Sequence, residues 1–161
     1  MKKNLIAVLA HQDDELCIFN RLNNFAYKEN IFIFYMTSGM DISFSKNRLS
    51  KRDLESLNVL RKLGVKKENI FFLGRKNLIN HNQLYKHLSL AFKVLLLNLK
   101  KIKGYNTVYT HSLEGGHEDH DACNYLIKAI NLKYNFFNIC YQFSAYHGKN
   151  LPFIFFKVFN P

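Results

Sequence analysis

The sequence has no tryptophan, two prolines, seven glycines and three cysteines among its 161 residues. So little proline and glycine excludes collagen-like and low-complexity chains, while 15 phenylalanines and 48% hydrophobic residues exclude an intrinsically disordered one. The cysteines, Cys17, Cys123 and Cys140, are widely spaced and form no CxxC pair, so we expect a reducing, cytoplasmic environment. A chain of this length is expected to form one domain over residues 1–161.

Acidic residues are also scarce, because 12 Asp and Glu stand against 23 Lys and Arg for a net charge of +11. This charge favours a polyanionic partner, such as phosphate, nucleic acid or an anionic lipid headgroup, without choosing among them. No apolar run reaches the roughly 20 residues of a membrane span, and the run 5–10 is too short for a signal peptide. We expect a soluble protein, with a peripheral membrane contact left open.

Short apolar runs alternate with longer segments of helical periodicity. Strands are predicted at Leu5–Ala10, Ile31–Met36, Ile70–Leu73, Thr107–Thr110 and Phe137–Phe143. Helices are predicted at Glu15–Tyr27, Leu49–Leu63, Gln83–Lys101 and Asp119–Asn131. The alternation predicts the α/β class, as a single Rossmann-like three-layer domain with a mostly parallel five-stranded sheet. The apolar tail Leu151–Phe159 is expected to complete the core or join two copies in a homo-oligomer, with a lipid contact left open.

Ligands of such sheets bind beyond the carboxyl ends of the strands. The turn after the first predicted strand has no glycine, which argues against a GxGxxG dinucleotide site, and the sequence has no P-loop. The turn carries His11, Asp13, Asp14 and Glu15 instead. Acidic residues at this place are also typical of a plain helix N-terminus, but His11 has no capping role.

A second polar cluster follows the fourth predicted strand, where His111, His117 and His120 lie close together in the sequence. His117 and His120 begin a helix three residues apart, so they face the same side. Two imidazoles, one carboxylate and an open position are the ligand set of a catalytic zinc, and Fe²⁺ accepts the same set. A remaining carboxylate would then deprotonate the attacking water. Three other histidines are expected to be ordinary solvated residues: His81, His87 and His147.

These segments resemble the signatures of one known family. Ala10–Glu15 (AHQDDE) resembles the AHPDDE signature of the PIG-L/LmbE-like family, the N-acetylglucosaminyl-phosphatidylinositol de-N-acetylase superfamily, and Gly116–His120 (GHEDH) resembles its GHPDH signature. Thr37–Gly39 resembles the family's T-N/S-G turn, and Arg52–Glu55 with a later Leu-Gly pair resembles its RxxE…LG helix. The resemblance extends to about Tyr141 with the same order and spacing.

The resemblance implies a zinc-dependent hydrolase that removes the acetyl group from an N-acetylated amino sugar of the N-acetylglucosamine type. His11, Asp14 and His120 would bind the metal. Asp13 would be the general base, and His117 would stabilise the oxyanion or act as an acid. Contacts with the substrate are expected from Arg52, Ser38 and His111. The expected substrate is anionic, being phosphorylated, nucleotide-linked or lipid-linked, and glycan biosynthesis is its expected pathway.

Three positions depart from the family's pattern. Gln12 and Glu118 stand where most members carry a proline, which stiffens a loop. Gly115 stands where some members carry a tyrosine or another donor, so polarisation of the carbonyl is expected from zinc, from His117 or from another side chain such as His111. The chain is also expected to be short at its C-terminus compared with most members.

An alternative from another class of function stays open. A basic domain could bind an anionic ligand or nucleic acid in a regulatory role and keep only a relic of the metal site. However, the sequence shows no recognition helix and no stacking-aromatic motif, so we expect no nucleic-acid partner.

Overall fold

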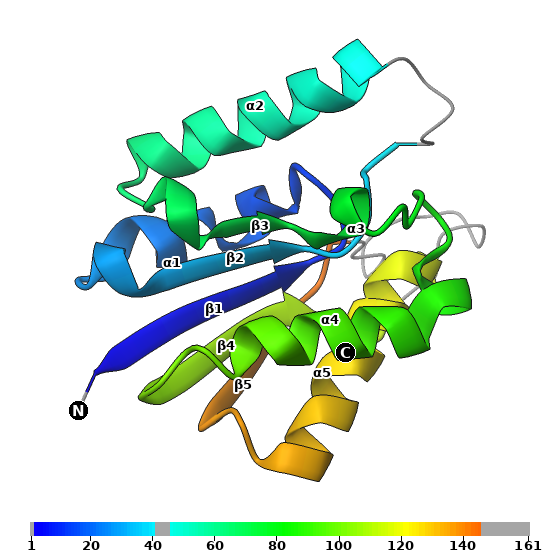
Figure 1. Ribbon diagram of the computed structural model, residues 1–161. Coiled ribbons are helices and arrows are strands. Elements are labelled where there is room, and N and C mark those ends of the chain that lie inside the picture. Colours follow the sequence, from blue (N-terminus) through cyan, green and yellow to red (C-terminus); the bar gives the residue numbers. More distant parts are fainter. Residues whose placement is uncertain (1, 41–45, 146–161) are drawn as a thin grey trace, which may run out of the picture.

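The computed structural model describes residues 2–40 and 46–145, and the predictions for His147 and the apolar tail lie outside these residues. Five parallel strands form one sheet in the order β3-β2-β1-β4-β5. The strands are β1 (Lys3–Leu9), β2 (Ile31–Tyr35), β3 (Ile70–Phe72), β4 (Tyr105–His111) and β5 (Ile139–Phe143). This arrangement confirms the predicted Rossmann-like α/β fold, and Figure 1 shows the strands side by side.

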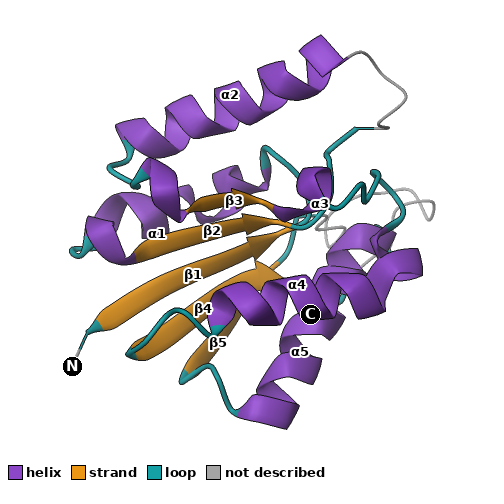
Figure 2. Ribbon diagram, viewed as in Figure 1, coloured by secondary structure: helices purple, strands orange, loops and turns teal. Residues whose placement is uncertain are grey.

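Helices cover both faces of the sheet and complete three layers. The α-helices are α1 (Phe19–Asn24), α2 (Lys46–Lys62), α3 (Leu73–Lys76), α4 (Leu88–Leu99) and α5 (Glu118–Tyr134). Short 3-10 helices are η1 (Asp14–Ile18), η2 (Lys28–Asn30), η3 (Lys67–Asn69) and η4 (Leu84–His87). Figure 2 shows α2 on one side of the sheet and α4 with α5 on the other. None of the helices in the described part of the chain is long and apolar enough to cross a membrane.

The central strand β1 supplies side chains to both layers, because successive residues of a strand point to opposite faces. Its apolar odd-numbered residues join a buried cluster with Leu22 of α1 and Leu60 of α2. Its apolar even-numbered residues join a second cluster with Leu95 of α4 and Leu126 of α5. With both faces covered, β1 is held firmly enough to fix the loop that follows it.

Two of the predicted helices differ in form from the observed ones. The segment predicted at Glu15–Tyr27 is the 3-10 helix η1 followed by the short helix α1. Its first turn is tight because Asp14 and Glu15 turn back and accept hydrogen bonds from backbone N–H groups, Asp14 Oδ2 from His11 (2.6 Å) and Glu15 Oε2 from Asp13 (2.9 Å). The segment predicted at Gln83–Lys101 likewise begins as the 3-10 helix η4 before α4.

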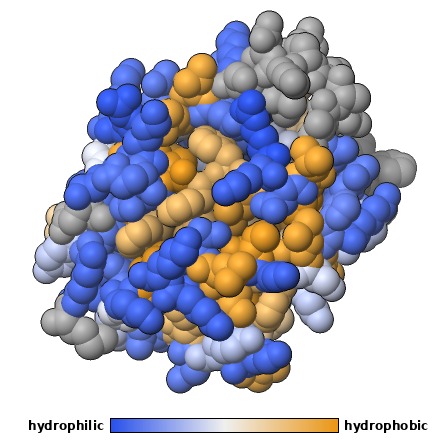
Figure 3. Space-filling view, in the orientation of Figure 1, coloured by the Kyte–Doolittle hydropathy of each residue, from blue (hydrophilic) through white to orange (hydrophobic). Residues whose placement is uncertain are grey.

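An apolar groove runs along the β3 edge of the sheet. It has a volume of about 600 Å³ and lies between β3 and α4, where Phe71 and Leu97 are among its lining residues. Figure 3 shows apolar side chains in the middle of the face of the molecule that is turned toward the viewer. The residues that line this groove do not include those of the two polar clusters that follow β1 and β4.

Candidate functional site

The two polar clusters meet where the strand order of the sheet reverses. The chain runs from β1 outwards to β2 and β3, then returns to β4 on the other side of β1. Loops that leave neighbouring strands in opposite directions open a crevice at this point. The residues His11–Glu15 follow β1, while His111 ends β4 and His117 precedes the first residue of α5. The structure therefore brings both signature segments to one crevice.

Three buried side chains in this crevice form a candidate metal set. One ligand atom from each of His11, Asp14 and His120 lies within 4.8 Å of the others. His11 Nδ1 is 3.6 Å from Asp14 Oδ2, and His120 Nε2 is 3.6 Å from Asp14 Oδ1. Ligand atoms of a tetrahedral zinc site, each about 2.0–2.2 Å from the ion, stand about 3.3 Å apart. The donor types and their separations therefore fit a zinc ion.

Asp14 is the centre of this set. Its Oδ2 accepts a hydrogen bond from the backbone N–H of His11 at 2.6 Å and lies 3.1 Å from His111 Nε2. Burial alone would raise the pKa of this carboxyl, but the contacts with His111 and His120 hold the pKa well below its usual range. The group is therefore an anion at neutral pH, which is the form that binds a metal.

Asp119 supports the metal set through His11, and the sequence patterns did not indicate it as a site residue. This fully buried carboxylate accepts hydrogen bonds from His11 Nε2 at 2.9 Å, Asn82 N at 2.6 Å and Leu84 N at 2.9 Å. His11 thus directs Nδ1 toward Asp14, in the carboxylate–histidine arrangement common behind metal ligands. An acidic residue in a first helical turn looks like a capping residue, which is why its partner 108 positions away was not foreseen.

Asp13 lies at the mouth of the crevice in a left-handed conformation, with φ of 106°, that is unusual for a residue other than glycine. Its N–H donates to Glu15 Oε2, which also accepts from the Tyr35 hydroxyl at 2.9 Å. Arg52 Nη2 donates to the Gln12 carbonyl at 2.6 Å and to Asp13 Oδ2 at 3.2 Å. Burial raises the pKa of Asp13, and the positive charge of Arg52 opposes the rise.

Two further imidazoles face the metal set. His117 Nδ1 accepts the N–H of Asp119 at 3.3 Å, and burial together with the neighbouring histidines lowers the pKa of His117 to about 4. The ring centroid of His81 lies 4.5 Å from that of His11 and 5.4 Å from that of His117. Burial, and secondarily His11, lowers the pKa of His81. The expectation that His81 is an ordinary solvated residue was wrong.

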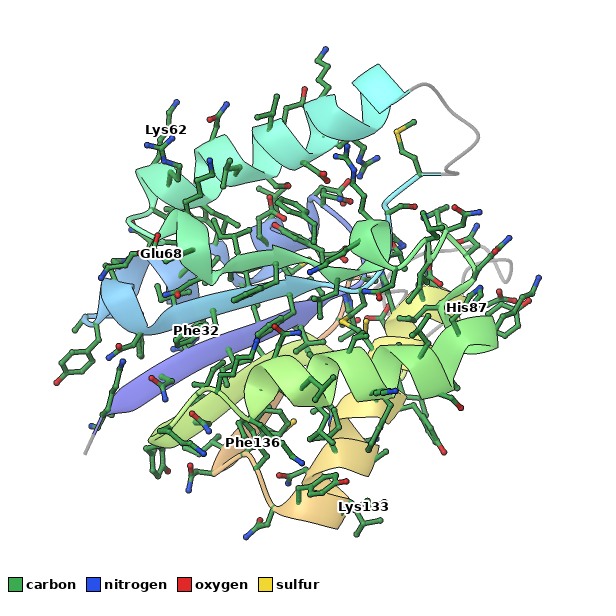
Figure 4. The ribbon with its side chains drawn as sticks, viewed as in Figure 1. Phe32, Lys62, Glu68, His87, Lys133 and Phe136 are labelled. Atoms are coloured by element: carbon green, nitrogen blue, oxygen red, sulfur yellow. The ribbon has the colours of Figure 1, made fainter. Side chains whose placement is uncertain are left out.

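A hollow of about 390 Å³ opens over these groups. Its lining includes the site residues His11, Asp13, Asp14, Arg52, His81, His117 and His120. His87, labelled in Figure 4 beside α4, does not belong to this lining within the described part of the chain.

Two expected substrate contacts lie outside the hollow. His111 is fully buried, and its Nε2 contacts Asp14 Oδ2 and the backbone nitrogen of Ala10. Ser38 is also fully buried, with its N–H donated to the Ile79 carbonyl at 2.8 Å. Both side chains stand behind the surface that a substrate would touch, so the structure corrects these two expectations.

Two of the three positions that depart from the family signatures have a local structural context that the structure describes. Gln12 Nε2 donates to Asp53 Oδ1 of α2 at 2.7 Å, and Asp53 also pairs with Arg75 of α3. These two contacts connect the loop after β1 to α2 and α3. They restrain a loop that a proline at position 12 would otherwise have stiffened. Gly115 is exposed, and a side chain added there would meet no atom within 4 Å, but as a glycine it supplies no side-chain donor.

Together, the fold and the site define a class: an α/β protein that carries a buried His–Asp cluster suited to a metal ion at the switch point of its parallel sheet. The family described as PIG-L, GlcNAc-PI de-N-acetylase, matches residues 6–131. Because this match spans most of the sequence, the chain belongs to the PIG-L family, and the resemblance seen in its motifs is confirmed. No protein of curated function matches the chain.

Proposed function

We propose that this protein is a zinc-dependent hydrolase that removes the acetyl group from an N-acetylated amino sugar. The observation that carries the proposal is the buried set of His11, Asp14 and His120, with the carboxylate of Asp13 beside it in one hollow. Membership of the PIG-L family supports an amide of an amino sugar as the substrate. The reaction consumes one water and yields acetate and the free amine.

The metal would be held by His11 through Nδ1, by His120 through Nε2 and by the Asp14 carboxylate, since these atoms face one another. These donors suit Zn²⁺, and Fe²⁺ also accepts them. When bound, the ion acts as a Lewis acid that polarises the amide carbonyl and lowers the pKa of water far below its ordinary value, to about 7.

Asp13 is the proposed general base. Its carboxylate lines the hollow beside the metal set, where it takes a proton from the water that attacks the amide carbon. Arg52 holds one oxygen of this carboxylate, and the left-handed backbone directs the side chain. Burial raises the pKa of Asp13, which makes it a better base than a solvated carboxylate. When the C–N bond breaks, the same proton passes to the leaving amine.

His117 is the proposed donor to the oxygen that becomes negative in the transition state. The N–H of Asp119 donates to Nδ1, so the proton of the neutral ring lies on Nε2. A low pKa of about 4, caused by burial and the neighbouring histidines, keeps the ring neutral at pH 7. Such a fixed N–H donor stabilises developing charge without reorganisation.

An anionic sugar derivative is the proposed substrate class. Arg52 places a guanidinium in the wall of the hollow, and the whole chain carries a charge of +11. Both features favour a phosphorylated, nucleotide-linked or lipid-linked N-acetylglucosamine over the neutral sugar.

The test combines metal content with amine release from a panel of N-acetylglucosamine derivatives. We expect about one zinc per chain and amine release that a chelator abolishes. Asp13→Asn tolerates the left-handed backbone, so it should retain zinc but lose turnover, whereas His120→Ala should lose both. His87→Ala is the matched control and should behave like the wild type. Absence of metal and turnover after zinc addition, with salt-sensitive nucleic-acid binding, would instead favour the regulatory alternative.

A further inference from the structure

His81 is held in the hollow by the carboxylate that supports the metal set. It precedes Asn82 and Leu84, whose N–H groups both donate to Asp119. Asp119 also accepts from His11 Nε2. One buried carboxylate therefore fixes a proposed metal ligand and the segment that carries His81, so the His81 ring has a defined place above the site.

The surroundings of the two facing imidazoles give their Nε2 atoms opposite hydrogen-bonding roles. His117 Nδ1 is an acceptor, which leaves an N–H on Nε2. His81 Nδ1 lies 4.0 Å from Asp119 Oδ2 and has no hydrogen-bond partner among residues 2–40 and 46–145. A carboxylate at this distance favours the proton on Nδ1, so Nε2 of the neutral His81 ring carries a lone pair. One ring offers a donor and the other an acceptor.

We propose that His81 accepts a hydrogen bond from the N–H of the scissile acetamido group, while His117 donates to its carbonyl oxygen. This inference rests on the proposed function and adds a specificity-determining residue to it. An amide presents an acceptor oxygen and a donor nitrogen side by side, whereas an ester lacks the donor. The pair of imidazoles would therefore select amides over esters of the same acyl group.

His81 is also within reach of a second set of metal-ligand atoms, made of His11, His81 and His117. That set shares His11 with the first one. Since His11 directs Nδ1 toward Asp14 and engages Nε2 with Asp119, it has no nitrogen to spare for a second ion. Substrate recognition is therefore the better use of His81, and metal stoichiometry separates the two.

The experiment measures binding of acetohydroxamate and N-methylacetohydroxamate to the zinc-loaded protein by calorimetry. The two probes differ in the N–H group that His81 would recognise. His81→Phe keeps a ring of similar size but removes both nitrogens, so a purely steric preference would survive this substitution. We expect acetohydroxamate to bind His81→Phe roughly two- to tenfold more weakly, the effect of one neutral hydrogen bond. Binding of the N-methyl probe should be unchanged, and His87→Phe should bind both probes like the wild type.

Two results would overturn the inference: an unchanged preference in His81→Phe, or a zinc content below that of the wild type, which would make His81 a metal ligand. A preference for the N–H probe that the wild type shows and His81→Phe loses, in a protein that releases no amine from any sugar, would support the role of His81 and count against the proposed function. A wild type that releases amine, with kcat/KM unaltered in His81→Phe, would do the reverse.

Discussion

Replacing Asp119 by asparagine tests the support of the metal set most directly. Oδ2 of the carboxylate accepts from His11 Nε2 and Asn82 N, while Oδ1 accepts from Leu84 N. An asparagine that places its oxygen at the Oδ2 position keeps two of these bonds and turns its NH₂ group toward the N–H of Leu84. One buried donor then loses its acceptor, and two bonds lose their charge assistance.

The magnitude follows from these three contacts. A buried donor without a partner costs about 1–3 kcal/mol, and weaker bonds to a neutral acceptor add to this, so Asp119→Asn should lower the free energy of unfolding by about 2–4 kcal/mol. A loss of this size leaves the protein folded, because domains have about 5–15 kcal/mol of stability. Without the carboxylate, His11 is a poorer ligand, and zinc affinity should fall about 10- to 100-fold.

The stability difference also depends on pH. Burial would raise the pKa of Asp119, but the hydrogen bonds from His11 and the backbone hold it below the ordinary value of 3.8. A pKa that is lower in the folded state than in the unfolded state means that the ionised carboxylate stabilises the fold. This stabilisation is complete at pH values above the unfolded-state pKa and decreases as the pH falls toward the folded-state pKa. The difference between wild type and Asp119→Asn in the metal-free state should therefore be full at neutral pH and shrink below about pH 4.

Urea unfolding of the chelator-treated protein and zinc competition with a chelating dye measure the two effects. Asp121→Asn is the matched control, because Asp121 lies on the same helix and accepts backbone N–H groups of Glu114 at 2.8 Å and Gly115 at 3.1 Å. It should lose stability but keep its zinc affinity. Equal zinc affinity in Asp119→Asn and the wild type would refute the reasoning.

Three further predictions concern the fold and the metal. Gly74→Ala would place a Cβ 2.1 Å from the Thr37 Cα, so unfolding in urea should show a loss of about 1–3 kcal/mol or more; unchanged stability would contradict this packing. His111→Asn should weaken zinc binding through Asp14 and leave the KM of the zinc-loaded enzyme unchanged. A higher KM with intact zinc affinity would restore the expected substrate contact. Zinc at about 1,000 times its Kd should stabilise the wild type by about 4 kcal/mol in thermal unfolding, and His120→Ala should show no such gain.

The sheet and the meeting of the two signature segments could be predicted because both follow from local patterns in the sequence. Strands buried on both faces, such as β1, appear in sequence as apolar runs, and the polar residues that follow them must meet at one edge of the sheet. The convergence of His11 and Asp14 with His120 follows from that rule alone. The roles proposed for these residues remain predictions.

The place of His81 was not predictable in the same way. His81 belongs to no signature, and its neighbour His11 is far away in the sequence. Its position depends on Asp119, whose partners lie 35, 37 and 108 residues away. His111 was misplaced for the related reason that its position at the end of β4 did not reveal that Asp14 stands in front of it.

The shared carboxylate of Asp119 has a thermodynamic consequence. Because it holds His11 and the backbone of Asn82 and Leu84 together, fixing either partner lowers the entropic cost of fixing the other. Linkage is reciprocal, so a metal that orders His11 favours binding at His81, and a ligand bound there must raise the affinity for the metal by the same factor. The hollow would therefore release its ion more readily when empty than when it holds an amide.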